Sequence, residues 1–249
     1  MTVESEKDLE GLLKIGRICG LTLKYMTEQV RVGMTTKALD ELGGKFLEQH
    51  GARSAPILAY NYPGYTCISI NDVAAHGIPD HRVIRPGDMV NIDVSAELDG
   101  YWADCGGTVP MPPISADKQR LCDFSKRALA AAIEVAKAGN PLNAIGRAVE
   151  TEAKRGGYSL IRELGGHGVG RFIHEPPTVP NVYLRSKEAR QPLVEGTVMT
   201  IEPFLTTGAI HVETDPDGWT LRMKGGGYVA QYEHTVVITK DRPILVTAV

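Results

Sequence analysis

The chain runs twice through the same order of predicted elements, and this internal repeat constrains its fold more than any other feature. The segment "VGMTTKALDELGGKFLEQHG" resembles "AGNPLNAIGRAVETEAKRGG", and "RPGDMVNID" resembles "LVEGTVMTIE". The matching glycines lie 106 residues apart in the first pair (Gly33 and Gly139) and 109 in the second (Gly87 and Gly196). A nearly constant offset predicts an internal duplication, with chance similarity of two helix–strand halves as the alternative.

The repeat places an acidic residue at the same point of each half, because Asp93 and Glu202 both lie six residues after a matching glycine. Two halves related by pseudosymmetry would set their matching strands on opposite sides of a central cleft. We therefore expect Asp93 and Glu202 to face one another. Taken alone, either acid would be a surface residue of a half-buried strand, since "VNIDVS" alternates apolar and polar residues. The same holds for Asp104 and Glu233.

Hydrophobic spacing and stop signals predict four helices and two groups of strands. Helices are expected over residues 4–31 and 115–138 and within the two repeated segments, the first of which has Thr35 or Thr36 as its N-cap. Residues 57–110 are expected to form strands and turns, and strand signal returns from "TVMTIEPF" to "YEHTVVITK".

The length suits one large domain or two modest ones, and 43% apolar residues are enough for a substantial core. We expect a single domain over residues 1–249, with pseudo-repeats over roughly 10–110 and 115–240. With a net charge of −3, the chain is not basic enough to indicate nucleic acid as its main partner. No apolar run approaches a membrane span, and "MTVESEKDLE" lacks the features of a secretory signal, so we expect a cytoplasmic protein. The four cysteines form no Cys-x-x-Cys pair, which predicts buried thiols rather than a disulfide framework or structural zinc site.

Three histidines lie in turn or glycine-rich segments: His167 and His174 in "GGHGVGRFIHEPP" and His76 in "AAHGIPD". Each alone is more commonly structural, but together with the four acids they predict a shared site. Oxygen-rich ligand sets with a single imidazole suit manganese, ferrous iron or cobalt better than structural zinc. Gathered carboxylates repel one another unless cations neutralise them, which two divalent ions would do while activating a water molecule.

Signatures of other chemistries are absent from the chain. It has no Gly-x-x-x-x-Gly-Lys phosphate loop, no Gly-x-Ser-x-Gly elbow and no His-Glu-x-x-His helix. A thiol nucleophile at Cys67 with His76 as its base would lack an orienting third group and would leave the acids unexplained. The sequence therefore favours metal-assisted chemistry.

The whole chain resembles the methionine aminopeptidases of the short bacterial type I. The similarity rests on "CISINDVAAHGIPD", "GDMVNIDVSAELDGYWADCGGT", "GGHGVGRFIHEPP", "TIEPF" and "AQYEHT", in the order and spacing of that family. It implies a single catalytic peptidase domain of the α+β class with the pita-bread fold, in which two pseudosymmetric halves form a curved central antiparallel sheet with outer helices. It also implies removal of the initiator methionine before a small second residue, by hydroxide attack from a centre of two divalent ions (Co, Mn or Fe(II)).

The resemblance assigns roles to individual residues. Asp93 would hold one metal, His167 and Glu202 the other, and Asp104 and Glu233 would bridge the two. Three residues would serve catalysis: Glu202 as proton acceptor, His174 on the substrate carbonyl and His76 on the scissile amide. The methionine pocket would be lined by Tyr62, Cys67 and Trp219. The chain departs from many relatives at Ile173, where they carry phenylalanine, and another pocket tyrosine has its counterpart at Ala59 or Tyr60.

The expected partner is the N-terminus of a peptide or nascent chain, with the ribosome exit region as a candidate place of encounter. A monomer without nucleic-acid or membrane partners is expected. Two alternatives share the fold: an aminopeptidase P or prolidase, which usually carries a large N-terminal domain, and a non-catalytic binding protein. The binding protein would be expected to lose metal ligands, whereas all five positions are filled here.

Overall fold

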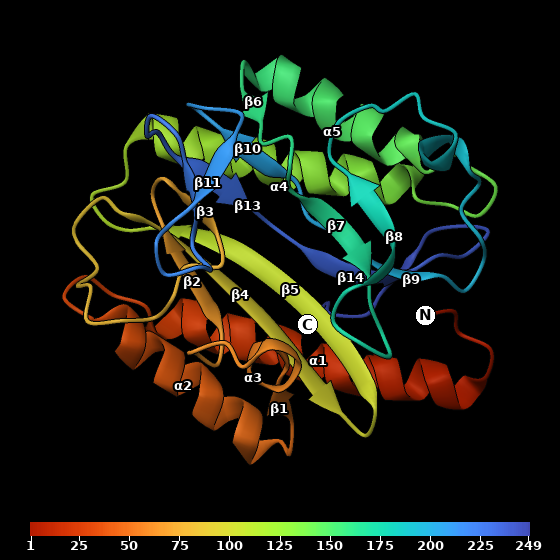
Figure 1. The fold of residues 1–249 in the computed structure, drawn as a ribbon, viewed down its shortest axis with the longest axis horizontal. Helices are drawn as coiled ribbons and strands as arrows, with labels where there is room; N and C mark the ends of the chain where they lie inside the picture. Colours follow the sequence, from red (N-terminus) through yellow and green to blue (C-terminus); the bar gives the residue numbers. More distant parts are fainter.

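The computed structural model describes residues 1–249, with helices on two sides of a central group of strands (Figure 1). The helices are α1 (Glu6–Gln29), α2 (Thr36–Gln49), α3 (Ala55–Tyr60), α4 (Ala116–Val135) and α5 (Asn143–Gly156), with a 3-10 turn, η1 (Glu188–Arg190). α1 and α2 cover one side of the strands, and α4 and α5 cover the other (Figure 1). The four predicted helices are confirmed, with bounds that differ by a few residues.

Polar capping side chains set the starts of these helices, and residues in the left-handed backbone conformation set some of their ends. Ser5 caps α1 by accepting a hydrogen bond from the backbone N–H of Asp8. Thr35, rather than Thr36, caps α2, and its side chain accepts from Ala38 at 3.1 Å. In the second repeated segment, α5 ends at Gly157, whose φ of 74° is readily adopted by glycine.

The expectation that residues 57–110 contain only strands and turns is wrong at their start, where α3 forms. Ser54 caps this helix by accepting a hydrogen bond from Ile57 N, and Pro56 lies in its first turn, where no backbone N–H is needed. Asn61 ends it in the left-handed conformation, with φ of 55°. Six residues are too few to show a helical period, so the flanking turn signals concealed the helix.

Fifteen strands make up the rest of the fold. They are β1 (Arg53–Ser54), β2 (Cys67–Ile70), β3 (Val73–Ala75), β4 (Met89–Leu98), β5 (Tyr101–Pro110), β6 (Ser159–Leu160), β7 (Gly165–Gly168), β8 (Glu175–Pro180), β9 (Val198–Ile201), β10 (Phe204–Thr206), β11 (Val212–Thr214), β12 (Leu221–Met223), β13 (Val229–Gln231), β14 (His234–Val237) and β15 (Ile244–Leu245). Every pairing between them is antiparallel.

The strands form two larger sheets and two small ones. In the first half β4 lies between β1 and β2 and also pairs with β5, whereas the second half has the order β15–β14–β9–β7–β8. The smaller sheets have the orders β13–β10–β6 and β11–β12–β3. Each group of strands follows a pair of long helices, the order that the repeat predicts, while the duplication itself stays a prediction.

The two halves meet where β5 approaches β14 (Figure 1). The hydroxyl group of Thr235, on β14, donates a hydrogen bond to the backbone carbonyl oxygen of Asp104 at 2.7 Å. The same Oγ1 accepts a hydrogen bond from the backbone N–H of Asp104 at 3.0 Å. An isolated bridge between Gly107 and Tyr232 continues this contact. A single hydroxyl group thereby satisfies both backbone groups of Asp104 and sets β5 beside the segment that carries Glu233.

Separate apolar clusters lie under the two halves. One contains 26 buried residues, mostly from α1, α2, β2, β4 and β5, and the other contains 21, mostly from α4, α5 and the second set of strands. All four cysteines are buried free thiols, as expected. None of the helices combines the length and apolar character needed to span a lipid bilayer.

Candidate metal centre and substrate cavity

The histidines and most of the acids identified in the sequence border one cavity of about 650 Å³ between the two halves. Its lining includes His76, Asp93, Asp104, His167, His174 and Glu202, together with Tyr62, Cys67 and Trp219. Glu233 borders a second hollow of about 710 Å³ between α1, α4 and β5. Its carboxylate nevertheless lies within 4.8 Å of ligand atoms of Asp104 and His167, which border the first cavity.

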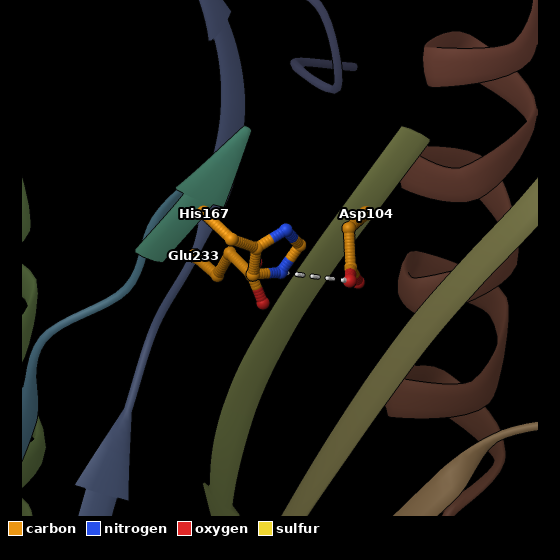
Figure 2. A group of neighbouring side chains, drawn as sticks. All are labelled: Asp104, His167 and Glu233. Atoms are coloured by element: carbon orange, nitrogen blue, oxygen red, sulfur yellow. Dashed lines mark ion pairs between the residues drawn. The ribbon is translucent and has the colours of Figure 1, made fainter. Parts of the chain in front are cut away.

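Asp104, His167 and Glu233 form a group of possible metal ligands. One ligand atom of each lies within 4.8 Å of the others, and Figure 2 shows the three side chains converging from β5, from β7 and from the segment between β13 and β14. His167 Nε2 lies 3.8 Å from Asp104 Oδ2 and 3.6 Å from Glu202 Oε1. Asp104 and His167 lie far apart in the sequence, so their contact depends on the packing of β5 against β14, which is joined to β7 through β9.

Asp93 joins this group through the register of the β4–β5 hairpin. Asp93 pairs with Gly106, and Ser95 pairs with Asp104, so the two aspartates lie diagonally on one face of the hairpin. Glu202 follows β9, and Thr200 donates a hydrogen bond to its Oε1 at 3.2 Å. The structure thus brings all five predicted ligands together, while their division between two metals stays a prediction.

Two carboxylate oxygens in this group are buried without any hydrogen-bond partner: Oδ1 of Asp104 and Oε1 of Glu233. Buried ionised oxygens are costly unless a proton or a cation satisfies them. Each of these two side chains offers a carboxylate oxygen within 4.8 Å of a ring nitrogen of His167, and an imidazole nitrogen is a good ligand for divalent metals. The residues present therefore fit the metal ions that the donor set implies.

Burial and mutual repulsion shift the ionisation of the acids in the same direction. Burial raises the pKa of Asp93 to about 6. It also raises the pKa of Asp104 well above its usual value, with further contributions from the charges of Glu233 and Asp93. The pKa values of Glu202 and Glu233 are likewise raised, first by burial and then by neighbouring carboxylates. Carboxylates that resist ionisation this strongly call for positive charge in the cavity.

Burial has the opposite effect on the imidazole of His167, whose pKa falls to about 3, with His174 as a further cause. A neutral ring keeps one nitrogen lone pair free for a cation. Nδ1 of His167 lies 3.0 Å from the carbonyl oxygen of Gly168, so it is the nitrogen that donates to the backbone. Nε2 therefore faces the acids as the free ligand atom.

Two buried amide side chains, those of Gln231 and Asn91, orient the carboxylate of Glu233. Gln231 donates from Nε2 to Glu233 Oε2 at 2.9 Å and accepts from Asn91 at 2.7 Å. Gly106 makes room for it, since a Cβ there would lie 2.6 Å from Gln231 Oε1. The sequence interpretation missed Gln231 and Asn91, although the position of Gln231 two residues before Glu233 in "AQYEHT" places both on one face of an extended segment.

His76 and His174 approach the cavity from two different segments. His76 follows β3 with a φ of 55°, which is rare for a residue other than glycine and concentrated at functional sites. Tyr62 anchors this turn by donating from its hydroxyl group to the Gly77 carbonyl at 2.7 Å. The ring of His174 lies 4.3 Å from that of His167, centroid to centroid. Both histidines are thus near the candidate ligands.

An apolar wall closes the rest of the cavity. Tyr62 and Trp219 meet edge to face, with ring centroids 5.2 Å apart, and Cys67 and Ile173 are buried beside the cavity. Of the two residues left open in the sequence, Tyr60 borders the cavity. Its neighbour Ala59 packs against the first apolar cluster. This wall suits an apolar side chain.

The chain matches known proteins over essentially its full length. Residues 10–240 match the model of Metallopeptidase family M24. A "Methionine aminopeptidase 2" from Bacillus subtilis (strain 168) is 43% identical over 249 residues, covering 99% of this chain and 99% of that protein.

Solved structures agree with the sequence matches. The crystal structure of methionine aminopeptidase from Rickettsia prowazekii has a TM-score of 0.94 and 33% identity, with both chains fully covered. A prolidase from Pyrococcus furiosus, at 21% identity and a TM-score of 0.79, shares the fold and has 66% of its own chain covered. The expected pita-bread fold is therefore confirmed, and the chain belongs to metallopeptidase family M24, a family of hydrolases, and within it to the methionine aminopeptidases.

Proposed function

We propose that this chain removes the N-terminal methionine from peptides and nascent proteins, with a preference for a small second residue. The observation that carries the proposal is the cavity itself, which joins an apolar wall to a cluster of acids and three histidines. The apolar wall would accommodate a methionine side chain, and the acids would bind the metal ions of an M24 metallopeptidase. We propose further that two divalent ions serve the reaction, with cobalt, manganese and Fe(II) all suited to the ligands.

The ligand set divides between the two metal positions in the way that the resemblance implies. Asp93 would hold one ion, His167 and Glu202 would hold the other, and Asp104 and Glu233 would lie between them. The unpartnered oxygens of Asp104 and Glu233 support the bridging roles, since each oxygen is free for a second contact. When bound, the ions would neutralise the carboxylates and activate a water molecule as the nucleophile.

The chain's own residues would position the substrate and move its protons. Tyr62, Cys67 and Trp219 would enclose the methionine side chain, and the free α-amine would bind near Asp93 and the metal that it holds. His174 would donate a hydrogen bond to the carbonyl oxygen as negative charge develops on it. Glu202 would accept a proton, and His76 would contact the scissile amide nitrogen and help protonate it as it leaves. Binding of the free α-amine near Asp93 would explain cleavage after the first residue only.

The proposed partner is the exposed N-terminus of a nascent chain, encountered in the cytoplasm near the ribosome exit region by a monomer. The net charge of −3 supports a partner other than nucleic acid as the main ligand. An X-Pro peptidase is the second function that the fold allows. The near-complete coverage of methionine aminopeptidases, against 66% coverage of the prolidase, favours the first.

The experiment compares the release of free amino acid from Met-Ala-Ser, Leu-Ala-Ser, Met-Trp-Ser and an X-Pro peptide. The protein is tested after chelation and again after addition of manganese or cobalt. We expect methionine release from Met-Ala-Ser only with metal, and much slower cleavage of the other three peptides. Asp104→Asn serves as the control for activity from a contaminating peptidase.

Two results would contradict the proposal. Cleavage of the X-Pro peptide without release from Met-Ala-Ser would indicate the prolidase reaction. A chain that takes up no divalent ion and releases nothing would indicate a binding protein of the same fold.

A further inference from the structure

Tyr60 and His174 form a hydrogen bond that the proposed reaction does not yet use. The hydroxyl oxygen of Tyr60 lies 2.6 Å from Nδ1 of His174, across 114 positions of sequence. Tyr60 makes no other side-chain hydrogen bond, and its hydroxyl group is therefore committed to this histidine. Both residues border the cavity that holds the candidate metal ligands.

The local structure holds Tyr60 in place for this contact. Tyr60 is the last residue of α3, and Asn61 then turns the chain with a φ of 55°. The Tyr60 ring meets Phe172 edge to face at 6.0 Å, and its centroid lies 5.5 Å from that of His174. The capped start of α3, the left-handed turn after it and the aromatic contacts together restrict where the hydroxyl group can point.

Chemistry sets the direction of the hydrogen bond. A phenol is a much better donor than acceptor, and an imidazole nitrogen without a proton is a good acceptor. The favoured arrangement therefore has Tyr60 donating to Nδ1, and the ring proton of His174 then lies on Nε2.

We propose that Tyr60 is a positioning residue that holds His174 in the tautomer with its proton on Nε2. Nδ1 is occupied by the tyrosine, so Nε2 is the ring nitrogen available to the substrate. A proton on this nitrogen lets His174 donate to the carbonyl oxygen, whereas the other tautomer would present a lone pair and repel it. The inference deepens the proposed function, on which it rests.

The competing explanation is that Tyr60 only forms part of the cavity wall. Tyr60→Phe separates the two, because it removes the hydroxyl group and keeps the ring that contacts Phe172. Tyr65→Phe is the matched control, since Tyr65 lies in the segment that follows α3, packs against Gly44 and donates no side-chain hydrogen bond to a histidine. The kinetic assay uses Met-Ala-Ser with the manganese-loaded enzyme.

For Tyr60→Phe we expect kcat to fall about tenfold while KM stays within about twofold, the pattern of an interaction that matters mainly in the transition state. Metal content should stay that of the wild type, and Tyr65→Phe should keep the wild-type kcat. A Tyr60→Phe enzyme with wild-type kcat would overturn the proposal. A variant whose only defect is a raised KM would also overturn the proposal, because that defect is expected of a residue that only forms the cavity wall.

A spectroscopic readout tests the hydrogen bond without activity. In protein with ¹⁵N-labelled histidine, assigned by means of His174→Gln, we expect a protonated Nε2 and an unprotonated Nδ1 for His174. Tyr60→Phe should convert this pattern to a mixture of tautomers. A proton on Nδ1 in the wild type, or an unchanged pattern in the variant, would contradict the inference. Should the wild type release no methionine, the proposed function fails, while this spectrum still decides the role of Tyr60.

Discussion

Gln231 Nε2 lies 2.9 Å from Oε2 of Glu233, and this amide decides which way the buried carboxylate faces. Asn91 in turn donates to the Gln231 oxygen at 2.7 Å, so the amide cannot rotate without losing a second hydrogen bond. The other carboxylate oxygen of Glu233 stays free and buried. Glu233 is therefore held ready to bind a cation rather than left to find its orientation when the metal arrives.

Gln231→Leu should weaken metal binding while leaving every predicted ligand in place. We expect the affinity for manganese to fall by about 10-fold or more, because partners behind metal ligands typically contribute 10–100-fold. Calorimetric titration of the metal-free protein measures this directly. Gln191 is exposed and lies outside the cavity lining, so Gln191→Leu serves as the control. Equal affinities for the two variants would show that the amide does not orient Glu233.

The raised pKa values make the metal-free protein sensitive to pH. The folded pKa of Asp93 is about 6, and those of Asp104, Glu202 and Glu233 are also above their ordinary values. The folded state therefore holds more protons than the unfolded state once the pH rises above about 4. By linkage, these groups lower the free energy of unfolding as the pH rises from about 4 through their folded pKa values.

Asp104→Asn should relieve this destabilisation, because it removes one charge and the repulsion that its neighbours feel. We expect the metal-free variant to unfold at a Tm about 3–10 °C above the metal-free wild type at pH 8, with the difference shrinking toward pH 4. Excess manganese should reverse the order, since the wild type binds the metal better. Scanning calorimetry at several pH values checks both statements. Asp241→Asn, at an exposed position, should show neither effect.

The helices and the hairpin of the first half could be predicted because their signals are local. The alternation in "VNIDVS" placed Asp93 on a strand, and the period of two residues explains why Asp93 and Asp104 share one face of the β4–β5 hairpin. The resemblance to methionine aminopeptidases named the five candidate ligands, and the structure brings them together. α3 escaped prediction because six residues beginning near a proline show no period.

The parts of the site that escaped prediction are contacts between distant segments. The bond between Tyr60 and His174 spans 114 positions, and the bond between Thr235 and Asp104 spans 131. No local pattern marks either pair, because each depends on how a helix end or a strand of one half packs against the other half. Sequence patterns therefore identified residue types, and the long-range packing determined which of them touch.

His76 and His174 should affect turnover far more than metal binding. We expect His76→Ala and His174→Ala to lower kcat by about 100-fold or more, since each removes a group proposed to act on the reacting amide. Metal analysis of the purified variants should find wild-type content. His81→Ala, at an exposed position outside the cavity, should keep wild-type turnover. Loss of metal from either cavity variant would mean that the residue is a ligand instead.

The β11–β12 hairpin carries Trp219 beside the cavity, and an arginine adds side-chain contacts to its pairing with β3. Arg222 of β12 contacts Asp215 through Nη2 at 2.8 Å and Asp72, in the turn between β2 and β3, through Nη1 at 2.9 Å. Trp219 in turn lies against Tyr62 of the apolar wall. The half-buried arginine thus connects the hairpin to the first half of the molecule.

Arg222→Gln should therefore loosen the wall around the methionine side chain without touching the reacting groups. We expect KM for Met-Ala-Ser to rise about 3–10-fold with kcat changed less than about threefold, because the loss falls equally on the ground and transition states. Lys224→Gln is the matched control, since it breaks the exposed ion pair with Glu213 across the same hairpin, and exposed pairs contribute little. Steady-state kinetics on both variants, with metal content measured in parallel, decide the point. If Arg222→Gln and Lys224→Gln give the same KM, Arg222 does not hold Trp219 in place.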